Sequence, residues 1–405
     1  MWLFEMDYSL FKTKRNVCLS FLIILSVCSQ LLISCTPSKK YMIQSQKKLI
    51  HDHQKVRVLI IKTRDNLRIS ADTKIRILDI KTGKAIYSGK SRTLIFSVEK
   101  VRKPIQIESW KIPIYVNKIP YRGSMEIHNI LGSLHVINVL SLDEYLYGVV
   151  PSEMSYSWNS EALKAQAIAA RTYALYHIMQ SKKGIYDLDA TTKSQVYKGI
   201  NIENKKTSDA INETSGEILS YNYKPIITYF HSTCGGKTCD DKYVWTNNDL
   251  PYLGQVKCPY CRNSPKYSWI EKLSLYQLKM MLRKEYKGVG KIKSISLKKK
   301  EGRVTLVIIQ HSNGIIRIPG NRFRLLMGAE RIKSLYFIAQ KTQNGLLLKG
   351  HGWGHGVGMC QWGAKGMADS GKSYEKILRY YYKGVKLTNI QRKIANRDKD
   401  SFDKE

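Results

Sequence analysis

"SEALKAQAIAARTYALYHIMQSKKG" spans residues 160–184 and has the composition of a single long helix. Ser160 suits the N-cap, Glu161 suits the positive end of the helix dipole, and Gly184 can terminate the helix. Small and aromatic residues recur at spacings of three and four: Ala162, Gln166, Ala169, Tyr173 and Tyr176. The alanines allow another backbone to approach one face closely, so the stretch predicts a long, well-packed helix.

The flanking sequence is rich in short alternating runs. Residues 55–118 contain "VRVLIIK", "KIRILDI" and "IPIYVN", separated by turn signals, which predicts a small β-rich N-terminal module. Strands are also expected in "GEILSYNYKPIITYFHSTC", "SISLKKKEGRVTLVII" and "GIIRIPG", and a second helix at 372–383 between Ser373 and Gly384. The predicted fold class is α+β: the β-rich module followed by a mixed α/β core over residues 119–390.

The N-terminus resembles an export signal. Lys12, Lys14 and Arg15 precede the apolar run "VCLSFLIILSVCSQLLIS", and "LISC" at 32–35 resembles a bacterial lipobox. Residues 1–35 are therefore predicted to be a signal peptide, with lipid attached to Cys35. An uncleaved anchor and an ordinary signal are the alternatives. Residues 36–54 are expected to be a tether and 391–405 a charged tail.

The chain is strongly basic. Its 67 Lys and Arg outnumber 32 Asp and Glu, giving a formal net charge of +35. Such a charge favours a polyanionic neighbour, such as an anionic lipid surface or an acidic wall polymer. The basic residues are spread along the chain, and no nucleic-acid-binding motif is present, so nucleic acid is not an expected partner.

"GVVPSEMSYSW" at 148–158 places Glu153 between an expected strand and the long helix. Its neighbours include Pro151, Met154 and Trp158. A carboxyl group among such residues would retain its proton because burial disfavours the charged form, as a general acid near neutral pH requires. The alternative is an exposed loop glutamate.

Four blocks resemble the SpoIID/LytB family, in the order found in that family. They are "LSLDEYLYGVVPSEMSYSWNSEALKAQAIAARTYAL", "YFHSTCGGKT", "PGNRFRLLMGAERIKSLYF" and "GHGWGHGVGMCQWGAKGMADSGKSYEKILRYYYKGVKL". Together they cover roughly residues 119–388. The resemblance implies an exported, peptidoglycan-active protein that remains in the bacterial cell envelope as a membrane-anchored lipoprotein. Some members are lytic transglycosylases that prefer glycan strands already stripped of stem peptides by an amidase. Others enhance an N-acetylmuramoyl-L-alanine amidase without being catalytic themselves.

The family's catalytic glutamate matches Glu153. The resemblance implies that Glu153 protonates the glycosidic oxygen of a MurNAc–GlcNAc linkage and then accepts the proton of the MurNAc C6 hydroxyl, leaving a 1,6-anhydroMurNAc end. A hydrolytic glycosidase usually needs a second carboxylate. Asp143, Glu144 and Glu161 are nearby in sequence, but none is a clear second catalyst.

Substrate-binding positions are expected on both sides of Glu153. Arg171 could bind the lactyl carboxylate of denuded MurNAc, with a surface salt bridge as the alternative. The resemblance implies that Gln195 and Tyr197 line a glycan groove, although by residue type alone they are ordinary strand residues. Tyr173, His231, Ser232, His355 and Gln361 are further candidates for lining this groove. A Ser232–His231 nucleophile is disfavoured because no orienting acid is evident.

"GHGWGHGVGMCQWGAKGMA" at 350–368 contains His351 and His355, four residues apart. This spacing suits a metal only on a helix, and the alternating glycines oppose a helix. A zinc hydrolase that uses His351, His355 and His231 is therefore a minor alternative. Close approach of the backbone to a sugar, with Trp353 or Trp362 stacking on it, fits better. Cys360 is expected to pack in the core.

The metal candidates are Cys234, Cys239, Cys258 and Cys261, in a C-x4-C-x18-C-x2-C arrangement. The last pair has the spacing of a zinc knuckle half-site. A structural zinc, with His231 as a further candidate ligand, competes with disulfides and with free thiols. No cofactor is expected to be required for catalysis.

Overall fold

The computed structural model describes residues 55–90, 93–181, 184–245 and 249–390. The predicted signal peptide, Cys35, the tether and the C-terminal tail lie outside these residues and stay predictions. Within the described ranges, none of the helices has the length and apolar character needed to cross a bilayer. The described elements mix helices and strands, which confirms the predicted α+β class.

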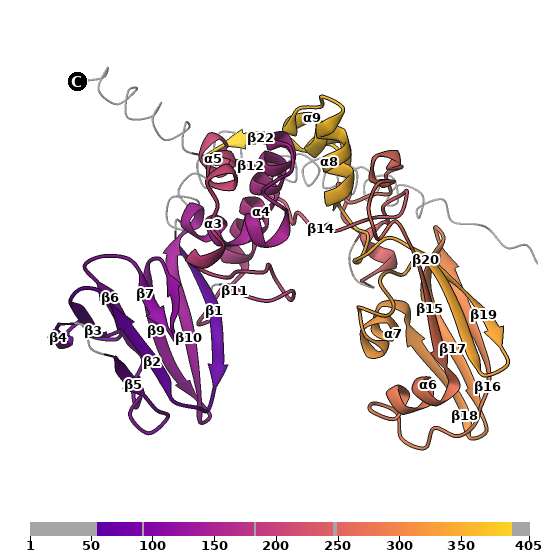
Figure 1. Cartoon of the computed structure of the whole chain (residues 1–405), viewed down its shortest axis with the longest axis horizontal. Helices are drawn as coiled ribbons and strands as arrows, with labels where there is room; N and C mark the ends of the chain where they lie inside the picture. The colour runs from indigo at the N-terminus through magenta and orange to yellow at the C-terminus, as the bar shows by residue number, and fades with distance from the viewer. Residues whose placement is uncertain (1–54, 91–92, 182–183, 246–248, 391–405) are drawn as a thin grey trace, which may run out of the picture. The chain divides into compact units, whose positions relative to one another are not determined.

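Two sheets form the N-terminal part (Figure 1). Val56 and Val58, and likewise Leu67 and Ile69, are fully buried at alternate positions, as the period of a β-strand requires. The larger sheet has the order β11-β1-β10-β9-β6-β3-β4 and the smaller β5-β2-β7-β8. The larger contains β1 (Lys55–Thr63), β3 (Ile75–Asp79), β4 (Ala85–Gly89), β6 (Ile105–Ser109), β9 (Ser124–Ile130), β10 (Ser133–Ser141) and β11 (Leu188–Asp189). The smaller contains β2 (Leu67–Ala71), β5 (Leu94–Phe96), β7 (Ile114–Val116) and β8 (Ile119–Tyr121).

The predicted boundary between residues 118 and 119 does not separate two structural units. β1 pairs with β10 along its whole length, with Lys55 opposite Ser141 and Thr63 opposite Leu134. β6 likewise pairs with β9. Strands from both sides of the boundary therefore share one sheet and one core. A strand's partner depends on long-range pairing, which alternation within the strand does not specify.

Helix α4 (Ser160–Gln180) confirms the predicted long helix. Its N-cap is Asn159 rather than Ser160, because the Asn159 side chain accepts a hydrogen bond from the Glu161 N–H at 2.9 Å. Its C-cap is Ser181, three residues before the predicted Gly184. Most of its residues are buried, as expected for a helix covered on all sides. It packs against α3 (Leu142–Glu153) and α5 (Lys205–Glu213).

Helix α3 corrects the expected strand before Glu153. Ser141 and Glu144 form a capping box at its N-terminus, and Glu153 is its last residue. The S-x-x-E spacing of Ser141 and Glu144 was the available sequence signal for this helix. The run of Leu, Tyr and Val that follows has strand propensity, and its burial in the core allows the helix to form.

A third part of the chain has its own hydrophobic core, which the sequence did not separate from the rest of residues 119–390. The core gathers Trp269, Leu278, Val307 and Phe323 among others. Its sheets have the orders β15-β20-β19 and β16-β17-β18. The elements are β15 (Ser268–Ser274), α6 (Leu275–Leu282), β16 (Ile292–Lys300), β17 (Arg303–His311), β18 (Gly314–Pro319), α7 (Gly320–Met327), β19 (Phe337–Thr342) and β20 (Gly345–His351).

The remaining elements follow α4 or close the chain. The predicted second helix is present as α9 (Tyr374–Tyr381), and Ser373 is its N-cap residue. A further helix, α8 (Gln361–Asp369), was not predicted. The strands are β12 (Glu217–Tyr221), β13 (Lys224–Pro225), β14 (Phe230–His231), β21 (Met359–Cys360) and β22 (Lys386–Asn389). The helices are α8 (Gln361–Asp369) and α9 (Tyr374–Tyr381), with single 3-10 turns at η2 (Ile200–Ile202), η3 (Asp241–Tyr243) and η4 (Pro259–Cys261).

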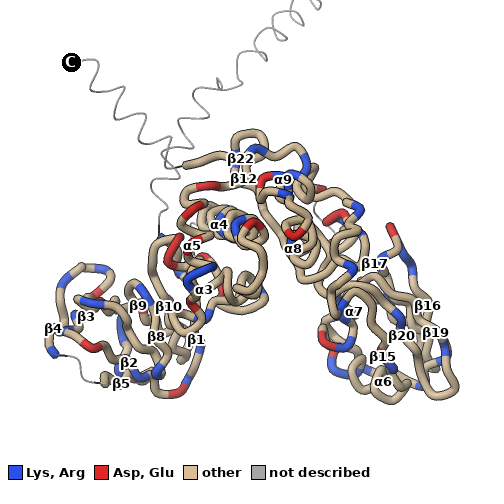
Figure 2. The backbone as a smooth tube through the Cα atoms, turned by 45° about the horizontal axis from the view of Figure 1, so that its top comes forward, with Lys and Arg blue, Asp and Glu red and all other residues tan. Residues whose placement is uncertain are grey.

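Basic residues occur on elements throughout the described chain, as Figure 2 shows. The density is high in the third part, where 18 Lys and Arg accompany four Asp and Glu between Ser268 and His351. The distribution agrees with the expectation of dispersed positive charge rather than one basic block.

Candidate active site

Parallel pairing of β14 with β21 brings two distant sequence motifs together. Phe230 lies opposite Met359, and His231 lies opposite Cys360. Beyond the strands, Thr233 and Trp353 exchange two backbone hydrogen bonds, of 3.0 and 2.7 Å. The "FHSTCGG" and "GHGWGHGVGMCQWG" segments are therefore adjacent in the fold.

The alternating glycines have a conformational cause. Gly352, Gly354, Gly356 and Gly358 all have positive φ, which residues with a Cβ rarely adopt. At Gly356 a Cβ would lie 2.5 Å from Cζ of the buried Arg303 side chain. At Gly358 it would collide with the carbonyl oxygen of Tyr229. The segment is tightly packed and irregular, which confirms that the His351–His355 spacing is not helical.

Glu153 sits at the C-terminal end of α3, partly buried. Its Oε1 accepts a hydrogen bond from the backbone N–H of Val196 at 2.9 Å. Burial raises the pKa of the Glu153 carboxyl, although the Val196 N–H, the Gln361 amide and the charge of Lys198 favour the ionised form and oppose this rise. The group thus keeps its proton at higher pH than an ordinary glutamate and still has donors to stabilise the carboxylate.

Gln361 connects Glu153 to α4. It is the first residue of α8, is 5% exposed, and its amide donates to the Glu153 carboxylate. Its Nε2 also lies 3.4 Å from Oε1 of Gln166. Gln166 is fully buried, and its Nε2 has no hydrogen-bond partner among the described residues. The sequence predicts only that Gln166 lies on the packed face of the helix, because a glutamine at such a position is usually an ordinary core or surface residue.

The three nearby carboxylates all have structural partners. Asp143 is bonded to Arg171 and to the Ser215 hydroxyl, the latter at 2.6 Å. Glu144 caps α3 through Ser141. Glu161 accepts a hydrogen bond from the backbone N–H of Tyr374 at 2.8 Å and pairs with Lys164. Each of these three carboxylates is thus engaged in a structural contact of its own.

The structure does not support a substrate-binding role for Arg171. Its side chain is 1% exposed, and its guanidinium pairs with Asp143 at 3.0 Å. It also donates to the carbonyl oxygens of Glu217 and Ile211 at 3.2 and 3.0 Å. A guanidinium whose donors are used inside the core is not available to a sugar carboxylate. Arg171 instead ties α4 to α3, α5 and β12.

Gln195 and Tyr197 are also interior residues rather than groove-lining ones. The Gln195 amide accepts from the Tyr145 hydroxyl at 3.2 Å and donates to the Ala170 carbonyl at 3.3 Å. The Tyr197 hydroxyl donates to Oδ1 of Asn138 at 2.8 Å, and the residue is 5% exposed. Their contribution is to hold the segment that carries Val196 against Glu153.

Tyr173 lies closer to the acid. Burial raises the pKa of its phenol, and the charges of Tyr229 and Glu153 add to the effect. Its ring also packs against that of His177 in a tilted arrangement, with 4.3 Å between centroids. Tyr173 is 7% exposed, so it too is an interior residue rather than an open lining of a groove.

His355 uses both ring nitrogens within the fold, whereas the buried Nε2 of His231 has no hydrogen-bond partner among the described residues. His355 bonds the Phe230 carbonyl oxygen through Nε2 at 2.9 Å and accepts from the Val357 N–H through Nδ1 at 3.1 Å. Burial, with the charges of Arg324 and Arg303, lowers the pKa of His355 to about 4, so the ring is neutral at neutral pH. His231 bonds the Val357 carbonyl oxygen at 3.0 Å and is 4% exposed. His355 therefore has no ring nitrogen free for a metal, against the zinc hydrolase alternative.

Exposed or partly exposed aromatic groups flank this region. Trp158, just after Glu153, packs edge-on against Trp362 with 5.1 Å between ring centroids. Tyr156 in the same loop is 57% exposed. Ser232 is partly buried, with its hydroxyl 3.4 Å from that of Thr233, and its carbonyl oxygen accepts the N–H of Trp362. Aromatic side chains therefore lie in the loop that follows Glu153 and in the first turn of α8.

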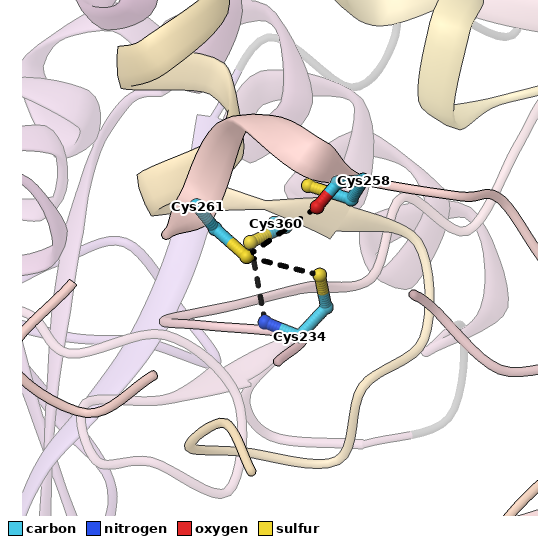
Figure 3. A group of neighbouring side chains, drawn as sticks. All are labelled: Cys234, Cys258, Cys261 and Cys360. Atoms are coloured by element: carbon cyan, nitrogen blue, oxygen red, sulfur yellow. Dashed lines mark hydrogen bonds between the residues drawn. The ribbon is translucent and has the colours of Figure 1, made fainter. Parts of the chain in front are cut away.

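The cysteine arrangement differs from the predicted one. Cys234, Cys258, Cys261 and Cys360 are fully buried, and their sulfur atoms all lie within 4.8 Å of one another (Figure 3). Cys239 is outside the group, with its Sγ against the carbonyl oxygen of Asp240 at 3.3 Å. His231 is outside it too. Cys360 replaces Cys239 because β14–β21 pairing, rather than sequence spacing, determines which thiols meet. All five described cysteines are free thiols.

Comparisons with known proteins match two stretches of the chain to family models. The family model "Stage II sporulation protein" (SpoIID) matches residues 131–221, and "Domain of unknown function (DUF8618)" matches residues 260–358. An uncharacterized protein of Brachyspira hyodysenteriae is 40% identical over 284 residues, covering 68% of this chain and 74% of that protein. Stage II sporulation protein D of Bacillus subtilis is 33% identical over 265 residues, 62% of this chain and 75% of that protein. An amidase enhancer of B. subtilis is 32% identical over 294 residues, 60% of this chain and 40% of that protein.

Proposed function

The chain belongs to the SpoIID/LytB family, and we propose that it is an exported lytic transglycosylase acting on the glycan strands of peptidoglycan. The observation that carries the proposal is the environment of Glu153: a carboxyl group whose pKa is raised by burial, with the Val196 N–H and the Gln361 amide as donors to its ionised form. Among the described residues, the nearby carboxylates of Asp143, Glu144 and Glu161 have structural partners of their own. The predicted lipid on Cys35 would hold the enzyme at a membrane surface beside its polymeric substrate.

The proposed reaction uses this single group twice. Protonated Glu153 gives its proton to the glycosidic oxygen as the bond from MurNAc C1 breaks through an oxocarbenium-like transition state. The C6 hydroxyl of the same MurNAc then attacks C1, and its proton returns to the Glu153 carboxylate. A 1,6-anhydro end forms and no water is consumed. The N–H of Val196 and the Gln361 amide would stabilise the carboxylate between the two steps.

Product analysis tests the reaction. Purified peptidoglycan, either intact or treated with an N-acetylmuramoyl-L-alanine amidase, would be incubated with the full chain and its fragments analysed by mass spectrometry. We expect 1,6-anhydro ends, one water lighter than hydrolysis products, with more cleavage on the amidase-treated strands. Reducing ends would contradict the single-carboxyl mechanism.

Gln361 provides a pH-dependent prediction. Its amide lowers the pKa of Glu153, so Gln361→Leu should raise that pKa and move the alkaline fall of kcat/KM to higher pH. A protonated acid is required, so activity declines as pH rises through the Glu153 pKa. Gln310→Leu, at an exposed position of β17, is the matched control and should leave the profile unchanged. An alkaline limb that does not move in Gln361→Leu would rule out the hydrogen bond as a determinant of the acid's pKa.

The second candidate function is enhancement of an amidase without catalysis, favoured by the similarity to the B. subtilis amidase enhancer. The two functions differ in their need for the carboxyl group. Amidase stimulation that is equal for the wild type and Glu153→Gln, with no glycan cleavage by either, would support the enhancer and oppose the transglycosylase.

A further inference from the structure

Lys198 lies in the segment of chain that contacts Glu153. Val196, two residues earlier, donates its backbone N–H to Oε1 of Glu153 at 2.9 Å. Burial raises the pKa of Glu153, and the positive charge of Lys198 is one of the effects that oppose this rise, so the ammonium group acts on the carboxyl group at electrostatic range. The Lys198 side chain is exposed, and it has no hydrogen bond or ion pair with the described residues.

The backbone is held in place on both sides of Lys198. The buried Tyr197 donates its hydroxyl to Oδ1 of Asn138 at 2.8 Å. Gly199 has a φ of 68°, and a Cβ at this position would lie 2.5 Å from the carbonyl oxygen of Pro120. The neighbours of Lys198 are therefore packed in the core, while its own side chain is free to reach a ligand beside the carboxyl group.

The other basic side chains on the helices of the site already have carboxylate partners. Lys164 and Arg171 of α4 and Lys365 of α8 form ion pairs at 2.7, 3.0 and 2.6 Å. Helix α3, which carries Glu153, contains no lysine or arginine. Lys198 differs from these cations because its charge remains available to a substrate.

Given the proposed function, on which this assignment rests, we propose that Lys198 binds the lactyl carboxylate of MurNAc and thereby selects strands without stem peptides. In an intact strand the lactyl group is linked to the stem peptide through a neutral amide. An amidase that removes the peptide leaves a carboxylate, so each denuded MurNAc gains one negative charge. An ammonium group favours this carboxylate over the amide, because hydrogen bonds between two charged groups are stronger than those to a neutral acceptor.

The position of the lactyl group on the sugar suits a cation close to Glu153. The lactyl group is attached to C3 of the same MurNAc ring whose C1–oxygen bond is cleaved, so its carboxylate stays near the proton donor. Lysine carries a compact charge on a flexible four-carbon stem, which suits reaching a carboxylate from an exposed backbone position. The role first expected of Arg171, whose guanidinium is used in the core, thus falls to Lys198.

Binding to glycans that differ only in charge tests the inference. The full chain carrying Glu153→Gln, which should bind strands without cleaving them, would be titrated with denuded glycan oligosaccharides. The same oligosaccharides with their lactyl carboxylates converted to neutral amides form the second ligand. We expect the denuded form to bind about tenfold more tightly at low salt, with a smaller ratio at high salt. Adding Lys198→Gln should bring the ratio close to one, and adding Lys198→Arg, which keeps the charge, should preserve it.

Lys193→Gln is the matched control. Lys193 is also an exposed lysine between β11 and η2, so this change removes the same charge from the same segment and should leave the ratio unchanged. Equal binding of the two ligands by the parent chain, no binding of either, a ratio that survives Lys198→Gln, or a ratio lost in Lys193→Gln would each overturn the inference. The titration requires no cleavage, so selective binding by a chain that yields no 1,6-anhydro ends would refute only the proposed enzymatic activity.

Discussion

Glu153→Gln should abolish glycan cleavage while the chain remains folded. Glutamine keeps the size of the side chain and can still accept the Val196 N–H, but it has no proton to give to the glycosidic oxygen. General acid catalysis typically contributes about 10²–10⁴-fold, so kcat should fall by at least that factor. Release of soluble glycan fragments, quantified by mass spectrometry, measures the loss.

The matched control is Glu144→Gln on the same helix. Glu144 caps α3, and glutamine at this position of a capping box can make the same contact with the Ser141 backbone. This variant should therefore retain activity. Equal losses in both variants would mean that the helix, rather than the acid, is responsible, and wild-type cleavage by Glu153→Gln would refute the catalytic assignment.

The stability of Glu153→Gln has a definite pH dependence. The folded-state pKa of Glu153 is raised, so folding favours its protonated form. The contribution of this group to stability is fully present below its unfolded pKa of about 4.3 and is lost as pH rises through the folded pKa. At pH 7 the variant should be as stable as the wild type or more so, and this difference should shrink toward pH 4. Thermal unfolding at both pH values checks the sign.

Arg171→Met should be among the most destabilising single changes in the helical core. It removes the pair with Asp143 and leaves the carbonyl oxygens of Glu217 and Ile211 without their guanidinium donor. Breaking a buried ion pair by removing one partner typically costs about 3–5 kcal/mol. Urea unfolding should therefore show a loss of this order in the free energy of unfolding.

Arg76→Met provides the contrast. Arg76 pairs with Glu108 on the N-terminal sheet, but both side chains are substantially exposed, at 45% and 32%. Such a pair is worth about 0–1 kcal/mol, so this variant should lose little stability. If Arg171 bound a substrate carboxylate instead, Arg171→Met would raise KM and leave the free energy of unfolding nearly unchanged.

Several features of the site could be predicted from residue types and spacing. The alternating glycines at 352–358 exclude a helix, because four successive alternate positions adopt positive φ. Burial raises the pKa of Glu153, in the direction that its apolar sequence neighbours suggested. Local rules sufficed for the glycines because the cause lies in the same short stretch of chain as the effect, whereas the groups that contact Glu153 come from Val196 and Gln361.

The predicted substrate-binding roles of three residues were wrong, because the partners of these residues lie in distant parts of the chain. Arg171, Gln195 and Tyr197 have side chains that suit sugar recognition, yet all three are used inside the core. Residue type defines which hydrogen bonds a side chain can make, but whether its partner is a ligand or another part of the protein depends on burial.

The α+β class, the long helix, the family and the carboxyl group proposed as catalyst can be inferred from the order of residues alone, because each is encoded in local periodicity or a contiguous motif. Which cysteines meet depends on the folded chain. Parallel pairing of β14 with β21 places Cys360 beside Cys234 and leaves Cys239 apart, although Cys239 is nearer in sequence. The same pairing sets Gln361 against Glu153, more than two hundred residues away. Such contacts arise from strand register and packing across the whole fold, which no spacing within a motif specifies.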